Sequence, residues 1–465
     1  MVTATGREPV WSNRLTYHDD LLLRTGRTLG VAVVNQTVWR LPAPLDGDAV
    51  RALHHALSNG PLQRVVRPGR LPGARARWAA STALLEPAVQ SAPVPEDAVL
   101  AWADRQAQVN LDPGNGPTWA IASASTASGR SLLSFVTSHV VADVGMHVGA
   151  LQAAVADVAA GTADRPAPSR RLPVEGERIR TGLVADLRDA TGQTRAVVGG
   201  LRRATRQGPL PSLMAQQSVD RARPRAHADD AQPADPPVVV VDTDASTWHR
   251  TAHAAGGTAS SLLIAVCTEI LLAAGAATAG MPVHVSIPVS LRGQGDLRSN
   301  VTSGVSIAVD TTVTLPPKRA GVVTDMAQIR SRSELAVSTS DTRADTAGLL
   351  QPLLQMVPEV VTGRAARAAA APMCRASNLG RLSATFAAPL GTPASGVLMR
   401  EVTQGLSRGR LREMRGGLDS WWSEHGGVAT LVVLGLDDDR LGEPGQLRAA
   451  VESVYTRRGL PMRFW

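Results

Sequence analysis

The chain has 465 residues, of which 44% are hydrophobic and 19% charged, which is typical of a folded globular protein with two or three domains. A net charge of +8 would suit nucleic acid, but only 3% of the residues are aromatic, too few for repeated base-stacking platforms, and no nucleic-acid-binding signature occurs. The two cysteines, Cys267 and Cys374, have neither the spacing of a metal site nor that of a disulfide framework.

The first part of the chain predicts alternating strands and helices. Residues 31–41 are a predicted strand and residues 49–57 a predicted helix. The mixed charged and apolar residues before them do not form a secretory signal, so we expect a cytoplasmic protein. Residues 60–78 are a predicted turn that carries Arg64, Arg67, Arg70, Arg75 and Arg77. We expect this turn to be a solvated basic surface, with contact to a phosphate-bearing ligand as the alternative.

The stretch from Ser131 to Val158 predicts a buried strand, a short break and a helix. Residues 132–138 are an apolar run of strand length. Apolar residues then recur in steps of four and three, as on one helix face, at Val144, Val148, Leu151, Val155 and Val158. His139 therefore lies where the strand ends, and Asp143 where the helix begins. A neutral imidazole in that position can take a proton from a hydroxyl or an amine near pH 7.

Two other interpretations of these residues remain open. Asp143 could cap the helix by accepting hydrogen bonds from its free backbone N–H groups. His139, Asp143 and His147 stand four residues apart, so on one continuous helix they would share a face and could hold a metal. The strand pattern that reaches Ser138 argues against such a helix.

After the central helix the composition changes. Segments rich in Pro, Arg and Asp at residues 161–173 and 221–237 indicate linkers. We interpret residues 171–236 as a crossover arm that is partly disordered. The arm separates an N-terminal subdomain, residues 1–170, from a C-terminal subdomain, residues 237–465.

The C-terminal part predicts a second set of strands around a core helix. Its predicted strands are residues 238–241, 283–287, 301–309 and 428–436. The apolar segment 261–281 is about long enough to span a bilayer, but it contains Glu269. Because Thr258 can cap this segment and its apolar residues make a stripe, we expect a core helix instead.

This order of elements resembles the condensation-domain and wax ester synthase/diacylglycerol acyltransferase group of the chloramphenicol acetyltransferase-like superfamily. The resemblance is carried by Asp112-Pro113, Pro117-Thr118-Trp119, His139-x-x-x-Asp143, Pro288-Val289-Ser290-Leu291-Arg292 and Ser377-Asn378-Leu379-Gly380. The motif of the group is His-His-x-x-x-Asp-Gly, and its catalytic second histidine matches His139. Ser138 replaces the first histidine, and Val144 separates Asp143 from Gly145.

The resemblance implies an α/β (α+β) fold of two subdomains, each a mixed sheet with flanking helices, with a tunnel between them. It implies that His139 is the general base, and that Asp143 pairs with an arginine to brace the turn. Arg292 is the expected partner, because guanidinium groups pair bidentately with carboxylates, and Gly145 supports the turn. Candidates for contact with the oxyanion or the substrate are Ser138, Ser377, Asn378 and Asn300, of which Asn300 is foremost a turn former.

We therefore expect an O-acyltransferase that forms an ester from acyl-CoA or from a phosphopantetheinyl carrier-protein thioester, in lipid or polyketide metabolism. No metal or other cofactor is expected. The expected protein is a monomer with at most peripheral membrane contact, whose partners are the thioester donor, a small alcohol or amine acceptor and, as a possibility, an acyl carrier protein. Amide formation and a non-catalytic binding protein are the alternatives.

A serine hydrolase is a further class to weigh, because Gly405-Leu406-Ser407-Arg408-Gly409 has the nucleophile-elbow pattern. Asp419 and His425 follow Ser407 in hydrolase order. All three residues lie between positions 407 and 425, which leaves almost no room for the strands and helices that separate them in a hydrolase fold. The pattern is therefore a weak indication of that chemistry.

Overall fold

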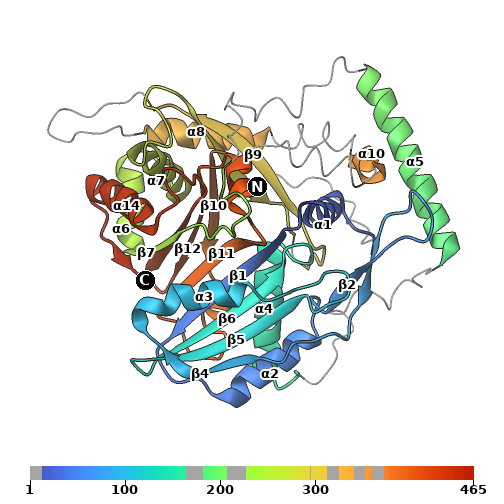
Figure 1. Ribbon diagram of the computed structural model, residues 1–465, viewed down its shortest axis with the longest axis horizontal. Coiled ribbons are helices and arrows are strands. Elements are labelled where there is room, and N and C mark those ends of the chain that lie inside the picture. The colour runs from blue at the N-terminus through green and yellow to red at the C-terminus, as the bar shows by residue number, and fades with distance from the viewer. Residues whose placement is uncertain are drawn as a thin grey trace.

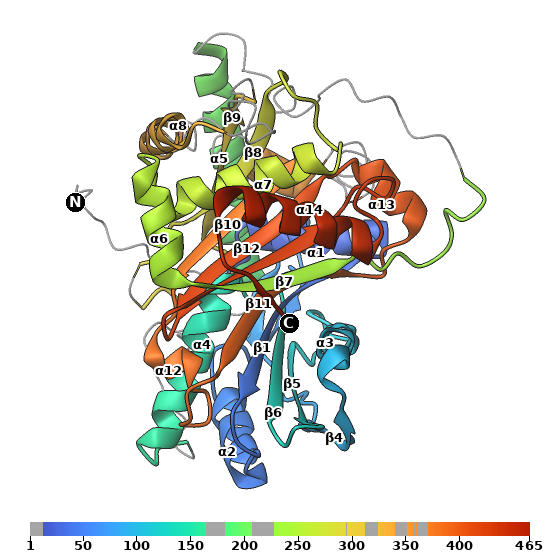
Figure 2. The same cartoon turned by 90° about the vertical axis from the view of Figure 1, so that its left-hand side faces the viewer.

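Two α/β lobes make up the part of the chain that the structure describes, and Figure 2 shows them one above the other. The structure is a computed structural model. It describes residues 13–163, 182–206, 227–293, 295–311, 324–339, 351–357, 359 and 371–465. Each lobe is built on one mixed β-sheet, as the family resemblance implies.

The first lobe contains a five-stranded sheet in the order β11-β1-β6-β5-β4. Its strands are β1 (Ala32–Leu41), β4 (Ala88–Val94), β5 (Trp119–Thr126), β6 (Ser131–Ser138) and β11 (Gly396–Gln404). Strands β4 and β5 run parallel, and the other neighbours run antiparallel. A separate two-stranded ribbon pairs β2 (Arg64–Arg67) with β3 (Arg77–Ala80).

Helices cover this first sheet. They are α1 (Tyr17–Leu29), α2 (Gly47–Ser58), η1 (Glu96–Ala98), α3 (Val99–Ala107), α4 (Val144–Ala159) and α12 (Ala384–Ala387). Thr16 and Asp19 form a capping box at the start of α1, which satisfies backbone N–H groups that the helix itself leaves free. Helices α2 and α4 share one apolar cluster with residues of β1, β5 and β6.

The second lobe contains a seven-stranded sheet in the order β14-β7-β13-β12-β10-β8-β9. Its strands are β7 (Val238–Asp244), β8 (Val283–Ser290), β9 (Thr302–Val309), β10 (Cys374–Arg381), β12 (Leu418–His425), β13 (Val428–Gly435) and β14 (Arg463–Phe464). Strand β10 runs parallel to both β8 and β12. The helices of this part are α6 (Ala245–Ala254), α7 (Ala259–Ala273), α8 (Met326–Ser338), α13 (Arg408–Met414) and α14 (Pro444–Arg458).

Helix α7 is the core helix of the second lobe. Thr258 caps it, as predicted, and residues 261–271 are buried. A helix that is apolar on all sides has to be buried against other elements. Within the described ranges no single helix is long and apolar enough to cross a membrane; α6 and α7 reach that length only together, and they meet at a bend of 86°.

Strand β11 crosses from the second half of the chain into the first sheet. It pairs with β1 from Ala32–Gln404 to Arg40–Gly396, and Figure 1 shows the two strands side by side at the centre of the molecule. Residues 237–465 are therefore not confined to the second lobe. Without β11, β1 would be an edge strand with unpaired backbone groups. Pairing with β11 satisfies those groups.

The expected crossover arm contains one described helix, α5 (Leu183–Arg206), and residues 171–181 and 207–226 of the arm lie outside the described ranges. Helix α5 lies at the outer edge of the molecule in Figure 1. Two ion pairs attach it to the first lobe, Asp186 to Arg14 at 2.6 Å and Asp189 to Arg75 at 2.8 Å. A short helix, α10 (Gln351–Met356), lies near α5.

The prediction that the basic turn is solvated is wrong for Arg64, which is fully buried. Its guanidinium lies 4.7 Å from the centre of the Trp78 ring. It donates hydrogen bonds to the carbonyls of Val141 and Leu297, each at 3.0 Å. Burial lowers the pKa of Arg64 to about 10, although nearby Asp19 opposes this shift. The side chain therefore holds loops of both lobes together.

Candidate active site

His139 lies one residue beyond the end of β6, where the sequence predicts it. Its backbone N–H donates to the Val33 carbonyl of β1 at 2.9 Å, which continues the strand pairing. The chain then turns, because Val141 and Ala142 both donate to the Ser138 carbonyl at 3.0 Å. The position of the imidazole is thus set by the backbone on both sides.

The His139 side chain reaches a cavity of about 240 Å³ between α1, the start of β1 and the loop of residues 112–114. Only 16% of the side chain is exposed. The lining is largely apolar and includes Leu22, Leu23, Val31 and Val33. A second cavity of about 410 Å³ has Leu23 and Arg27 in common with the first as wall residues, and it is also lined by residues of the basic turn. The imidazole therefore lies beside a partly open, largely apolar space.

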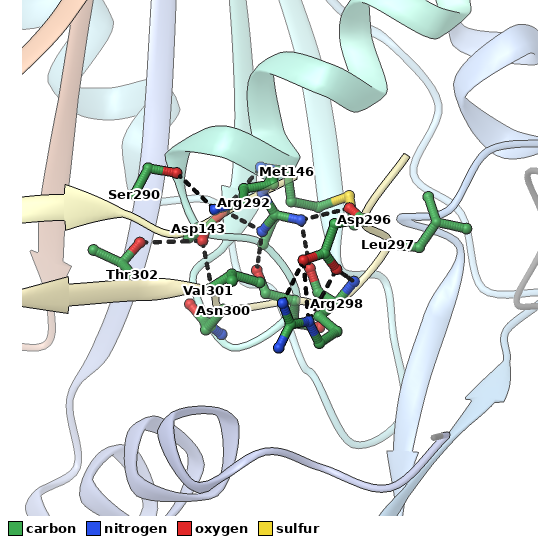
Figure 3. A network of polar contacts seen from close by, with 12 residues as sticks. Asp143, Met146, Ser290, Arg292, Asp296, Leu297, Arg298, Asn300, Val301 and Thr302 are labelled. Carbon is green, nitrogen blue, oxygen red and sulfur yellow. Dashed lines mark hydrogen bonds and ion pairs between the residues drawn. The ribbon is translucent and has the colours of Figure 1, made fainter. Parts of the chain in front are cut away.

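Asp143 combines the two roles that the sequence leaves open, helix capping and arginine pairing. As the N-cap of α4 it accepts the backbone N–H of Met146 at 2.8 Å. Its other oxygen accepts the Val301 N–H at 2.8 Å and the Thr302 hydroxyl at 3.1 Å. Arg292 Nη2 lies 2.6 Å from Asp143 Oδ1, so the predicted contact is present. Figure 3 shows that these partners approach Asp143 from different sides.

Arg292 organises the loop between β8 and β9 in the second lobe. Its Nη1 donates to the carbonyls of Asp296 at 2.7 Å and Arg298 at 2.8 Å, and its Nη2 also donates to the Ser299 carbonyl at 3.1 Å (Figure 3). One guanidinium thus holds its own loop and Asp143 of the other lobe. The pair joins the two lobes directly behind the His139 turn.

Gly145 is needed for the close approach of Arg292. A Cβ atom at position 145 would lie 2.8 Å from Arg292 Nε and 3.2 Å from its Cδ. Gly149, one turn further along the same helix, has nothing within 4 Å of its own Cβ position. The glycine of the Asp143-Val144-Gly145 sequence therefore makes room for the ion pair.

Gly145→Ala is expected to destabilise the protein by about 1–3 kcal/mol, because the new methyl group must displace Arg292 from Asp143. Urea unfolding followed by circular dichroism measures the change. Gly149→Ala is the matched control, and it is expected to be neutral or stabilising by about 0.5–1 kcal/mol, because alanine is a better helix former than glycine. Equal unfolding midpoints for the two variants would contradict the packing role of Gly145.

Asn300 holds the backbone that carries the imidazole. Its side-chain amide donates to the carbonyls of His139 and Val140, both at 3.1 Å, and to Asp19 Oδ1 at 2.9 Å. All of its donor capacity is used in this way, so the structure does not support Asn300 as a donor to an oxyanion. Its expected role as a turn former extends to fixing the His139 loop from the second lobe.

Ser138 lines the same cavity as His139, but Ser377 and Asn378 are not part of that lining. Ser138 is buried in β6 opposite Val34 of β1. Ser377 is buried in β10, and Asn378 beside it donates to Ser260 Oγ at 2.7 Å, at the start of α7. In the described ranges none of the three forms a hydrogen bond with the His139 side chain. Their expected contact with an oxyanion or a substrate stays a prediction.

Glu401 and Arg375 complete the polar surroundings of His139, and neither was predicted from the sequence to lie in the site. Glu401 Oε1, on β11, lies 3.4 Å from His139 Nε2. Its other oxygen lies 2.7 Å from Arg375 Nη1, and Arg375 also pairs with Asp419. The available signal was weak: Glu401 follows Arg400 in a strand that is otherwise largely apolar.

The buried neighbours change the acid–base properties of the imidazole. Burial by itself lowers the pKa of His139, but the hydrogen bond and the charge of Glu401, together with the charge of Asp143, outweigh it, so the pKa of His139 is raised. Burial raises the pKa of Glu401, but the charge of Arg375 and the contact with His139 outweigh it and lower that pKa to about 2. The site therefore pairs a carboxylate with a more basic histidine.

His147 is a core histidine and not a metal ligand. Its Nε2 lies 2.8 Å from the Thr37 hydroxyl, and its Nδ1 lies 2.9 Å from the Thr137 hydroxyl. Burial lowers the pKa of His147 to about 3, with a smaller contribution from His139. Because both ring nitrogens are engaged by threonines, the metal interpretation of the His139, Asp143 and His147 spacing is not supported.

The positions of Ser407, Asp419 and His425 do not support the hydrolase interpretation either. Ser407 caps α13 and accepts the backbone N–H of Arg410 at 3.2 Å. Asp419 pairs with Arg375 instead of orienting a histidine. His425 closes β12 next to a glycine turn. Ser407 therefore lies at the start of α13, whereas Asp419 and His425 lie near opposite ends of β12.

Comparisons with known proteins establish the fold. No protein-family model matches the chain, and no curated protein matches it. The first condensation domain of the calcium-dependent antibiotic synthetase, in complex with a substrate analogue, aligns with a TM-score of 0.57 at 14% identity, over 96% of this chain and 97% of that one. Another structure of that condensation domain aligns with a TM-score of 0.56 at 14% identity, over 98% and 100%.

A condensation domain from the monacolin K polyketide synthase aligns with a TM-score of 0.54 at 12% identity, over 96% of each chain. These alignments cover nearly the whole chain and therefore span both lobes. The chain thus has the two-lobed chloramphenicol acetyltransferase-like fold of condensation domains.

Proposed function

We propose that the protein transfers an acyl group from a thioester to a hydroxyl acceptor or to an amine acceptor, with His139 as the general base. The observation that carries the proposal is a buried imidazole of raised pKa, which lies beside a partly open cavity in a fold shared with condensation domains. Ester formation is the predicted outcome from the sequence, and amide formation is the other outcome of the same chemistry.

In the proposed reaction the oxygen or nitrogen of the acceptor molecule attacks the thioester carbonyl, and His139 Nε2 takes the proton from that atom. The tetrahedral intermediate then collapses, the C–S bond breaks, and the thiolate leaves with the proton that the imidazolium returns. No serine or cysteine nucleophile takes part, so both substrates have to be bound together. General base catalysis of this kind typically contributes about 10²–10⁴-fold, and alignment and oxyanion stabilisation supply the rest.

The cavities support a thioester donor. The smaller cavity, which holds His139, is lined by Leu22, Leu23 and Val140 and suits an acyl chain. The larger cavity is lined by polar groups, among them Arg24 and Gln193, and suits the amide-rich arm of coenzyme A or of a carrier protein. Leu23 and Arg27 line both cavities, so the cavities are neighbours, and the proposal places the thioester carbonyl in the smaller one, near the imidazole.

The experiment is a substrate panel with the full chain. Acyl-CoA and acyl-pantetheine thioesters of several chain lengths are combined with small alcohols and amines, and products and released thiol are measured by mass spectrometry. The expected result is product only when donor and acceptor are both present, with no acyl group left on the protein. Binding without turnover across the whole panel, or a stable acyl-protein, would overturn the proposal.

A further inference from the structure

A chain of charged side chains leads away from the imidazole into the second lobe. It runs from His139 to Glu401, from Glu401 to Arg375 and from Arg375 to Asp419. All four side chains are at least two-thirds shielded from solvent. With His139 neutral, the chain holds one cation between two carboxylates and therefore has one uncompensated negative charge. Protonation of His139 removes that imbalance.

The separation of Glu401 from His139 is set by the backbone of strand β1. Glu401 is paired with Asn35 of β1, and the His139 N–H is bonded to Val33 of the same strand. Arg375 fixes the carboxylate from the other side, and its guanidinium lies 5.7 Å from the centre of the Trp421 ring. Neither group can move away without breaking these contacts, so the carboxylate is held beside Nε2.

We infer that Glu401 is a positioning residue that holds a negative charge beside the imidazole of His139 and stabilises its protonated form during acyl transfer. The inference rests on the proposed function. Glu401 Oε1 lies 3.4 Å from Nε2, the nitrogen that takes the proton, so the carboxylate compensates the positive charge that forms there.

Other charged groups around the ring point to the same conclusion. Asp143, at the start of α4, adds a further negative charge, which Arg292 largely compensates. His147, on α4, is neutral across the working range because of its low pKa. Asp112 and Arg27 line the cavity and carry opposite charges. Glu401 is thus the carboxylate whose charge acts most directly on the imidazole.

Glu401→Gln keeps the shape of the side chain and removes its charge. The pKa of His139 is expected to fall, so the basic form of the imidazole exists at lower pH, and the acid limb of the kcat/KM profile moves to lower pH. The plateau of kcat/KM is expected to fall about 10- to 100-fold, because a less basic imidazole, whose protonated form has lost its compensating charge, is a weaker general base. Glu401→Asp, which retains the charge, is expected to recover part of the rate and of the pH profile.

Glu424→Gln is the matched control. Glu424 is also a buried glutamate paired with a histidine and an arginine, since it lies 2.7 Å from His249 and 2.6 Å from Arg381. This cluster is separate from the His139 cavity, so the pH profile and the rate are expected to stay as in the wild type. An equal shift in both variants would show a general structural effect and would overturn the positioning role.

A titration of the histidine ring signals by nuclear magnetic resonance tests the inference without any substrate. The His139 signal is assigned by its absence in His139→Ala, and its pKa is compared between wild type, Glu401→Gln and Glu401→Asp. A His139 pKa that falls in Glu401→Gln, and falls less in Glu401→Asp, supports the inference even if the panel shows no acyl transfer. An unchanged His139 pKa in folded Glu401→Gln would overturn it even if acyl transfer is observed. If Glu401→Gln does not fold, Glu401→Asp decides: a carboxylate drawn back from Nε2 must alter the titration.

Discussion

Replacing His139 with alanine is expected to lower kcat/KM for acyl transfer by about 10²–10⁴-fold, the usual contribution of a general base. The fold is expected to persist, because the ring borders a cavity and its backbone contacts remain. Glu401 keeps its partner Arg375 at 2.7 Å, so the substitution does not leave an unpaired carboxylate. Steady-state kinetics with the best substrate pair, together with thermal unfolding, measure both effects.

His249→Ala is the control for this prediction. His249 also contacts a glutamate, at 2.7 Å from Glu424, but it lies on α6 and is half-exposed. We expect wild-type kinetics from this variant. If His139→Ala retained the wild-type rate, or if both variants lost activity to the same degree, the assignment of His139 as the base would be wrong.

Asp143→Ala is expected to cause the largest loss of stability, about 3–5 kcal/mol in the free energy of unfolding. The substitution removes the cap of α4, two hydrogen bonds to the β9 region and the partner of Arg292. A largely buried guanidinium is then left without its carboxylate, and desolvation makes such an unpaired charge costly. Urea unfolding at neutral pH measures the difference from the wild type.

Asp310→Asn is the matched control, because Asp310 pairs with Arg332 at 2.9 Å while both side chains remain partly exposed. Exposed pairs of this kind contribute little, so we expect a change below about 1 kcal/mol. The double variant Asp143→Asn, Arg292→Met is expected to be more stable than Asp143→Asn, since it also removes the uncompensated charge. A loss of stability no greater than that of Asp310→Asn would contradict the clamp between the lobes.

The local features of the site were predictable, because short-range geometry produces them. A strand period changes to a helix period between Ser138 and Val144, and this change places His139 at a strand end. An aspartate immediately before the helix caps it in the structure. The contact between Asp143 and Arg292 was predictable only through the family resemblance, because 149 positions separate the two residues.

Other parts of the site could not be predicted, because they depend on contacts between distant segments. Glu401 comes to the imidazole only because β11 leaves its own half of the chain and pairs with β1. Arg64 lies in a segment that reads as a solvated turn, yet the Trp78 ring and two backbone carbonyls bury it. No local period encodes either contact.

Periodicity alone predicts alternating strands and helices, and it places one histidine and one aspartate on either side of a strand-to-helix break. The fold of two α/β subdomains was implied by the family resemblance. Which strand completes the first sheet, which carboxylate faces the histidine and which arginines become buried were decided only when the chain folded. The physical reason is that strand pairing and the compensation of buried charge join residues far apart in the chain, and their free energy depends on the whole packed structure.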